Sequence, residues 1–328
     1  MREFKVHELL TNRRGFVATA LVGGAALAAT GAGTVALAAD DITAPKFRYC
    51  LNMSTINSSQ IPLREQLKIA SQAGYDSVEL WLRDADTYEK NGGDLKSVRK
   101  ELDDLGLGVD SAIAFGKWIV DDDKQRAAGL ETCKRDMDRL RQLGGRRMAA
   151  PPSGATDLGP SGKKIDLDHA ATRYAALLEL GRSQEVIPQV ELWGFSKNLS
   201  KLAEVLYIAA AANSADACIL LDVYHLYKGG SDFSNLGLVP GTKMHCLHMN
   251  DYPATPPRDS IADRDRVYPG DGVAPMDHIL QTLVRGGFSG TLSLELFNRT
   301  YWAQDPHEVA RTGLAKMKAA VASAFRAR

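Results

Sequence analysis

Short apolar runs alternate with segments of helical periodicity along the chain, and this alternation narrows the fold more than any other feature. The eight runs are Phe47–Asn52, Tyr75–Trp81, Gly106–Phe115, Arg147–Ala150, Ile187–Trp193, Ala217–His225, Met244–Asn250 and Thr291–Phe297. Apolar residues recur at helical spacing between them, within residues 63–73, 130–143, 174–180, 199–212 and 279–284. Alternating strands and helices indicate an α/β protein with parallel strands. Eight such units in about 290 residues indicate one closed (β/α)8 barrel rather than an open sheet.

The first 38 residues have a different character from the rest. Arg13-Arg14-Gly15-Phe16-Val17 precedes an uncharged stretch rich in Ala and Gly, which includes the small-x-small sequence Ala36-Leu37-Ala38. The paired arginines resemble a twin-arginine export signal. A transmembrane anchor is the alternative, but the many glycines and few large apolar residues disfavour a stable span. We therefore expect a cleavable signal at 1–38, a barrel domain at 39–328, and a periplasmic or secreted protein without a stable membrane anchor.

The charge of the chain bears on its binding partners, and its cysteine content bears on disulfide bonds. The chain has 40 basic and 40 acidic residues, a formal net charge of zero, and no basic cluster interleaved with aromatic residues. This composition argues against a nucleic-acid partner. The four cysteines show no C-x-x-C spacing and are expected to be buried free thiols rather than a disulfide framework. The oligomeric state is left open.

Acidic residues stand inside several of the apolar runs. The tetrapeptide Val-Glu-Leu-Trp occurs at 78–81 and 190–193, and Ser-Leu-Glu-Leu-Phe occurs at 293–297. Because an ionised carboxylate in an apolar setting is costly without a partner, these positions need an explanation. In a (β/α)8 barrel the carboxyl ends of the strands converge on one mouth.

Strands five to eight would bring four polar side chains to that mouth in succession: Glu191, Asp222, His248 and Glu295. Each acid alone could instead cap a helix or form a salt bridge. Three carboxylates close together repel one another unless a cation lies among them. Oxygen ligands with one imidazole suit Mn²⁺, Mg²⁺ or Co²⁺ better than a structural zinc site.

The stretch from strand five to strand eight resembles the xylose-isomerase-like barrel family, in particular its sugar isomerase and epimerase branch. The resemblance implies one divalent cation, with Mn²⁺ expected first. The implied ligands are Glu191 in VELW, Asp222 in LLDVYH, His248 in HMND and Glu295 in SLELF. His225 and Arg266 match residues that contact substrate oxygens in the family.

Glu79 ends strand two, and we expect it across the mouth, beyond reach of the ion. There it would bind a sugar hydroxyl or pair with Arg83.

The resemblance also implies a chemistry. A divalent ion acidifies the C–H next to a sugar carbonyl, and Glu191 and Glu295 would be the acid–base pair that exchanges the proton through an enediolate. We expect an isomerase or epimerase acting on a free sugar, keto-sugar or related polyol. A metal-dependent lyase or dehydratase acting on an inosose or 3-keto-glycoside uses the same first step and stays open.

Two further alternatives are weaker. A non-catalytic sugar-binding barrel would be expected to lose one glutamate of the pair, and both are present. An apurinic-site endonuclease of the same family would need histidines on strands two and three that this sequence lacks.

Overall fold

The computed structural model describes residues 43–326, so the expected signal at 1–38 lies outside the described residues. The described chain forms one eight-stranded sheet in which all paired strands are parallel, ordered β3-β2-β1-β8-β7-β6-β5-β4. The strands are β1 (Arg48–Asn52), β2 (Ser77–Trp81), β3 (Gly108–Ile113), β4 (Arg147–Ala150), β5 (Ile187–Glu191), β6 (Ile219–Asp222), β7 (Met244–Met249) and β8 (Thr291–Leu294). The predicted single (β/α)8 barrel is thereby confirmed.

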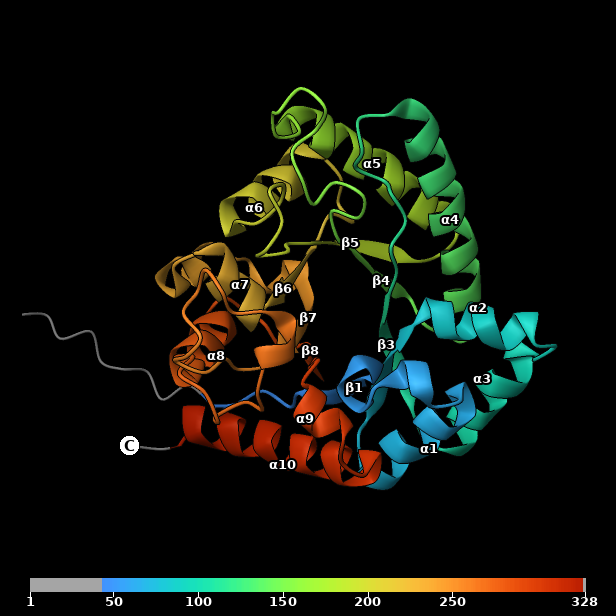
Figure 1. Cartoon of the computed structure of the whole chain (residues 1–328), viewed down its shortest axis with the longest axis vertical. Helices are drawn as coiled ribbons and strands as arrows, with labels where there is room; N and C mark the ends of the chain where they lie inside the picture. Colours follow the sequence, from blue (N-terminus) through green and yellow to red (C-terminus); the bar gives the residue numbers. More distant parts are fainter. Residues whose placement is uncertain (1–42, 327–328) are drawn as a thin grey trace, which may run out of the picture. The chain divides into compact units, whose positions relative to one another are not determined.

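Helices surround the strands on the outside of the barrel (Figure 1). They are α1 (Leu63–Ala73), α2 (Leu82–Lys90), α3 (Leu95–Asp104), α4 (Asp123–Gln142), α5 (Leu167–Ser183), α6 (Leu202–Ala211), α7 (Val223–Gly229), α8 (Met276–Arg285), α9 (Arg299–Trp302) and α10 (Pro306–Ala324). Short 3-10 turns complete the connections: η1 (Met53–Ile56), η2 (Ser58–Gln60), η3 (Phe233–Leu238), η4 (Gly241–Lys243) and η5 (Asp263–Asp265).

Two element boundaries differ from the sequence expectation for local reasons. The sixth strand ends at Asp222, because the Asp222 side chain accepts a hydrogen bond from the His225 backbone N–H and so begins α7. The helix expected from residue 199 begins at Leu202 instead, because Leu199 has a left-handed backbone with φ of 52°.

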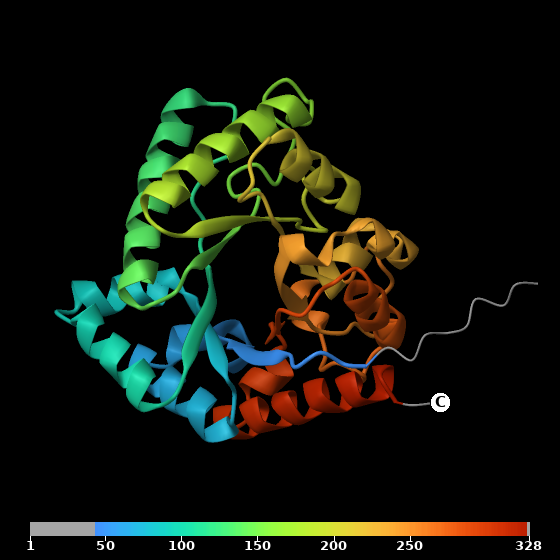
Figure 2. The same cartoon turned by 180° about the vertical axis from the view of Figure 1, so that it is seen from behind.

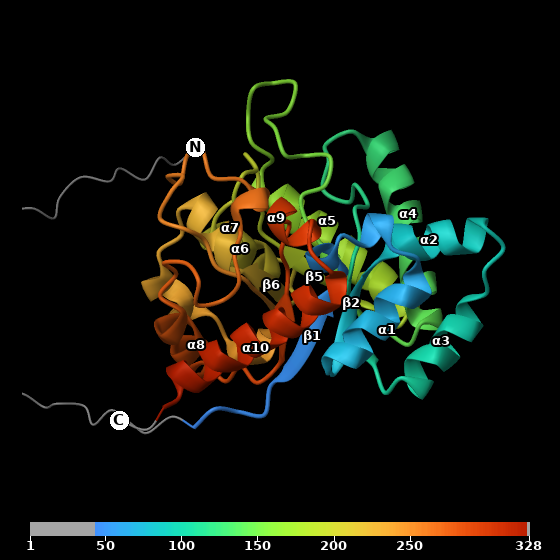
Figure 3. The same ribbon diagram turned by 60° about the horizontal axis from the view of Figure 1, so that its bottom comes forward.

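Strands β3 and β4 stand at the two ends of the hydrogen-bonded order and contact each other, which brings the sheet round into a barrel. Inside it, Gln189 on β5 donates a hydrogen bond to Ser111 on β3 at 3.2 Å. In Figure 2, which views the molecule from behind, the chain runs into β1. The start of the described chain lies beside the end of α10 (Figure 3), and the rings of Phe47 and Phe325 are 6.4 Å apart there.

All four cysteines are buried and free, as the sequence predicted. No helix within residues 43–326 is long and apolar enough to cross a membrane.

Candidate functional site

The carboxyl ends of the strands gather the predicted polar residues into one buried cluster. Glu191 ends β5, Asp222 ends β6, His248 lies near the end of β7, and Glu295 directly follows β8. The parallel register pairs Asp222 with His248, so these two side chains stand at the same height in the barrel. Each of the four residues is at most 5% exposed. The structure therefore brings together the four residues that the sequence singled out as ligands; their role as ligands stays a prediction.

The Nδ1 atom of His248 faces all three acids of this group. It lies 3.2 Å from Glu295 Oε2, 3.7 Å from Glu191 Oε1 and 3.8 Å from Asp222 Oδ2. No atom among residues 43–326 makes a geometrically satisfactory hydrogen bond to it. A buried ring nitrogen aimed at three carboxylates is a donor set that suits a divalent cation.

Glu79 occupies a place that the sequence reasoning did not expect. Its two carboxylate oxygens lie 3.0 and 3.1 Å from His248 Nε2, on the side of the ring opposite Nδ1, and its side chain is fully buried. The expectation that Glu79 lies across the mouth from the cluster was wrong, because β2 is separated from β8 only by β1 in the closed sheet. Its predicted contact with substrate stays a prediction. Arg83 pairs with Asp84 instead of Glu79.

This contact gives Glu79 a clear local effect. A carboxylate that accepts the Nε2–H of a histidine fixes the tautomer in which Nδ1 carries a free lone pair. Ser293 and Asn52 also donate hydrogen bonds to Glu79, at 2.7 and 2.9 Å, and hold its carboxylate in place.

Without a cation, the cluster carries an excess of negative charge. The cluster holds four buried carboxylates, those of Glu79, Glu191, Asp222 and Glu295, and one guanidinium, that of Arg266, which pairs with Asp222 and Glu295. Its net charge is minus three when all four acids are ionised and His248 is neutral. Burial, reinforced by the neighbouring Glu295 and Asp222, raises the pKa of Glu191 well above its usual value. A divalent ion would relieve this repulsion, so the residues present fit such an ion.

Other members of the cluster are held ionised by their neighbours. Burial would raise the pKa of Glu295, but His248 and Arg266 outweigh it and lower the pKa. Burial would likewise lower the pKa of His248, but Glu295 and Glu79 raise it well above its usual value.

Arg266 and His225 form the outer side of the cluster. Arg266 Nη1 donates to both Asp222 and Glu295 at 2.9 Å, and its Nη2 lies 3.1 Å from His225 Nε2. Burial lowers the pKa of His225 to about 4, which keeps its ring neutral. Both residues line the cavity above the cluster, as expected of residues that contact substrate, although their role stays a prediction.

The loop that carries Arg266 is tied down by one aspartate. Asp251, which follows β7, accepts backbone hydrogen bonds from Gly270, Gly272 and Ala274 at 2.9–3.2 Å. An antiparallel bridge joins Asp251 to Val267. These hydrogen bonds hold the loop so that the Arg266 guanidinium lies over Asp222 and Glu295.

Two asparagines that the sequence reasoning missed complete the cluster. Asn52 donates to both Glu79 and Glu295, at 2.9 and 3.1 Å, and Asn250 donates to Asp222 at 2.8 Å. Both are fully buried at the ends of their strands. A polar residue that closes an apolar strand was the available signal, the same one that identified Asp222.

Aromatic rings line the cavity that opens above these carboxylates. They belong to Trp81, Phe115, Trp193, Phe195 and Phe297, and the same cavity is lined by Glu191 and Glu295. Neighbouring ring centroids are 5.3–6.1 Å apart along the row.

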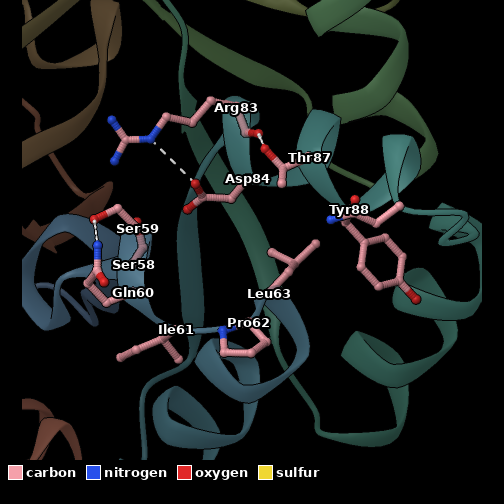
Figure 4. Close-up of a pocket in the computed structure, with 11 residues that line it drawn as sticks. Ser58, Ser59, Gln60, Ile61, Pro62, Leu63, Arg83, Asp84, Thr87 and Tyr88 are labelled. Atoms are coloured by element: carbon pink, nitrogen blue, oxygen red, sulfur yellow. Dashed lines mark hydrogen bonds and ion pairs between the residues drawn. The ribbon is translucent and has the colours of Figure 1, made fainter.

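A separate groove lies between η2 and α2 (Figure 4). It contains none of the residues predicted for the site. Arg83, which lines the groove, connects it to the aromatic row described above, because the Arg83 guanidinium lies 4.1 Å from the ring centroid of Trp81.

Comparison with known proteins supports the fold. The sequence pattern of the family described as "Xylose isomerase-like TIM barrel" matches residues 67–320. Inosose isomerase from Bacillus velezensis is 24% identical over 283 residues, which cover 85% of this chain and 98% of that protein.

Two other curated relatives match over shorter shares of their length. Inosose isomerase from Halalkalibacterium halodurans is 29% identical over 42% of this chain. 3-Dehydroshikimate dehydratase from Pseudomonas aeruginosa is 27% identical over 77% of this chain. The matches span only 48% and 39% of these two proteins, respectively.

Solved structures share the fold at low identity. A crystal structure of the IolI protein with a bound zinc atom aligns with a TM-score of 0.77 and 21% identity, and covers 86% of this chain and all of that one. L-Ribulose 3-epimerase aligns with a TM-score of 0.67 and 21% identity, and covers 85% of this chain and 96% of that one.

Proposed function

Because the chain belongs to the xylose isomerase-like TIM barrel family, we propose that it is a divalent-metal-dependent isomerase or epimerase of an uncharged sugar, keto-sugar or polyol-derived ketone. The observation that carries the proposal is the pair Glu191 and Glu295, which line one cavity and lie 3.7 and 3.2 Å from His248 Nδ1. Relatives named inosose isomerase support this class of reaction.

Glu191, Asp222, His248 and Glu295 would hold one divalent ion, with Mn²⁺ as the first candidate and Mg²⁺ or Co²⁺ as alternatives. The ion would polarise the carbonyl and the neighbouring hydroxyl of the substrate, which acidifies the C–H between them. Removal of that proton would give an enediolate.

The residues of this chain supply the remaining steps. One carboxylate of the Glu191–Glu295 pair takes the proton from carbon, and the other returns one. Return to the opposite face of the same carbon gives an epimer, and return to the neighbouring carbon gives an isomer. Arg266 and His225, at the outer side of the cluster, are placed to bind substrate oxygens, while the aromatic row keeps bulk water away.

Dehydration is the second candidate, and one observation favours it. The relatives named 3-dehydroshikimate dehydratase match 77% of this chain. Loss of the leaving group β to the carbonyl, after the same proton removal, would turn the site into a lyase. An inosose would lose its β-hydroxyl as water and a 3-keto-glycoside would lose its aglycone as an alcohol, with the second glutamate returning the proton to the leaving oxygen.

Product analysis in D₂O separates these outcomes. The Mn²⁺-loaded protein would be incubated with ketoses, inososes and 3-keto-glycosides, and the products followed by NMR. Deuterium on carbon without loss of water supports the isomerase or epimerase, whereas an unsaturated product supports the dehydratase. No deuterium and no product with any of these compounds would contradict both.

A further inference from the structure

The aromatic row continues outward beyond the space around the carboxylates. Trp81 is 7% exposed, and its ring is enclosed by Phe115, by Phe297 and by the Arg83 guanidinium. Phe115 and Phe195, in contrast, are 41% and 44% exposed. Both flank Trp193, at ring centroid distances of 6.1 and 5.3 Å. The inner part of the row is therefore covered, while the outer part presents free ring surface.

Two exposed aromatic rings lie at this cavity. Within residues 43–326, six large apolar side chains are exposed; Phe115 and Phe195 line the cavity, and the other four do not. Single exposed apolar residues are common on protein surfaces, but a contiguous group at the rim of a cavity marks a ligand contact.

The charges around the cavity restrict what those rings could contact. Arg266 is the one guanidinium or ammonium group among its described lining residues. That guanidinium is 1% exposed and already bonded to Asp222, Glu295 and Asp263. Three carboxylates already offset its positive charge, so the geometry favours an uncharged ligand over a phosphate or carboxylate.

From these observations we propose that Phe115, Trp193 and Phe195 form a subsite for a second ring of the substrate. The substrate would then be a neutral keto-glycoside, in which the reacting keto-sugar occupies the inner cavity and its aglycone stacks on the outer aromatic surface. The stacked group has a flat apolar face, which either an aryl ring or a second pyranose provides. This inference rests on the proposed function for the identity of the reacting sugar, but the stacking surface binds independently of turnover.

A binding experiment tests the subsite without requiring catalysis. Dissociation constants would be measured by calorimetry for the Mn²⁺-loaded protein with four probes: phenyl β-D-glucopyranoside, cellobiose, methyl β-D-glucopyranoside and D-glucose. Phenyl glucoside, cellobiose or both should bind about 3- to 10-fold more tightly than methyl glucoside, the range expected for one aromatic stacking contact. Which of the two gains affinity identifies the second ring as aryl or sugar.

Variants locate the effect. In Phe115→Ala and Phe195→Ala the advantage of the two-ring probes should shrink toward the affinity of methyl glucoside. Leu238→Ala removes a more exposed apolar side chain from η3, outside this cavity, and should leave all four constants unchanged. Equal affinity for all four probes, or an advantage that survives both phenylalanine variants, would overturn the subsite.

The outcomes also separate this inference from the proposed function. Tighter binding of two-ring probes without proton exchange on any keto-sugar would leave the subsite standing and remove the isomerase. Proton exchange on free keto-sugars, without tighter binding of the two-ring probes, would support the isomerase and remove the subsite.

Discussion

At the scale of single residues, the Glu79 carboxylate fixes the ring of His248, a proposed metal ligand. Glu79 faces Nε2 of the His248 ring, and Nδ1 faces the acids of the cluster. Glu79→Gln should weaken Mn²⁺ binding by about tenfold, because hydrogen-bond partners of this kind contribute 10- to 100-fold to metal affinity. Calorimetric titration of the folded variant measures this. An unchanged metal affinity with a raised Michaelis constant would instead mean that Glu79 contacts substrate.

The two cavity-facing glutamates should behave differently from Glu79. Glu191→Gln and Glu295→Gln should each lower turnover by at least about 100-fold, the usual effect of losing a general acid or base. Glu131→Gln changes an exposed glutamate of α4 and serves as the matched control. Deuterium exchange in D₂O measures the loss. Full exchange in Glu295→Gln, with none in Glu79→Gln, would move the acid–base pair to β2 and β5.

At the scale of elements, α4 carries a mostly buried aspartate, Asp136, and ionisation of its carboxyl group destabilises the folded state. The Asp136 side chain is 13% exposed, and burial raises its pKa to about 6, despite the opposing charge of Arg139 at 3.4 Å. A carboxyl group with a pKa above its unfolded value binds more protons in the native state, so it lowers stability as pH rises from about 4 to about 6.

Asp136→Asn should remove this pH dependence. The variant should gain stability over the wild type between pH 4 and pH 7, by up to about 3 kcal/mol for a shift of roughly two pKa units. Urea unfolding at both pH values measures the difference. A variant that is less stable at pH 7 would show that the Arg139 ion pair dominates over burial.

Most of the strands and helices could be predicted from the sequence, and so could most residues of the buried polar cluster. All eight strands begin within two residues of the apolar runs, because buried parallel strands are continuous in hydrophobicity. Glu191, Asp222, His248 and Glu295 could be grouped because successive strands of a barrel are neighbours. The contact between Glu79 and His248 could not be predicted. It depends on closure of the sheet, which brings together two residues that are 169 positions apart in the chain. The backbone at Leu199, which delays α6, likewise has no signal in an apolar residue type.

At the scale of the whole molecule, we propose that the twin arginines direct export of the barrel through the twin-arginine route, which would place the substrate outside the cytoplasm. Lysine at both Arg13 and Arg14 keeps the charge but should retain the protein in the cytoplasm. Cell fractionation with an antibody against the barrel measures its location. Undiminished delivery to the periplasm would point to the general secretory route or to a membrane anchor.

The most direct test of the metal centre is the amount of metal that the folded barrel binds. The site should take up one divalent ion per chain, measured by elemental analysis after dialysis against Mn²⁺. Asp222→Asn and His248→Ala should reduce that amount while circular dichroism shows the barrel still folded. About three zinc ions per chain, no ion at all, or one ion retained at full affinity in both variants would contradict a single ion held by the ends of β5 to β8.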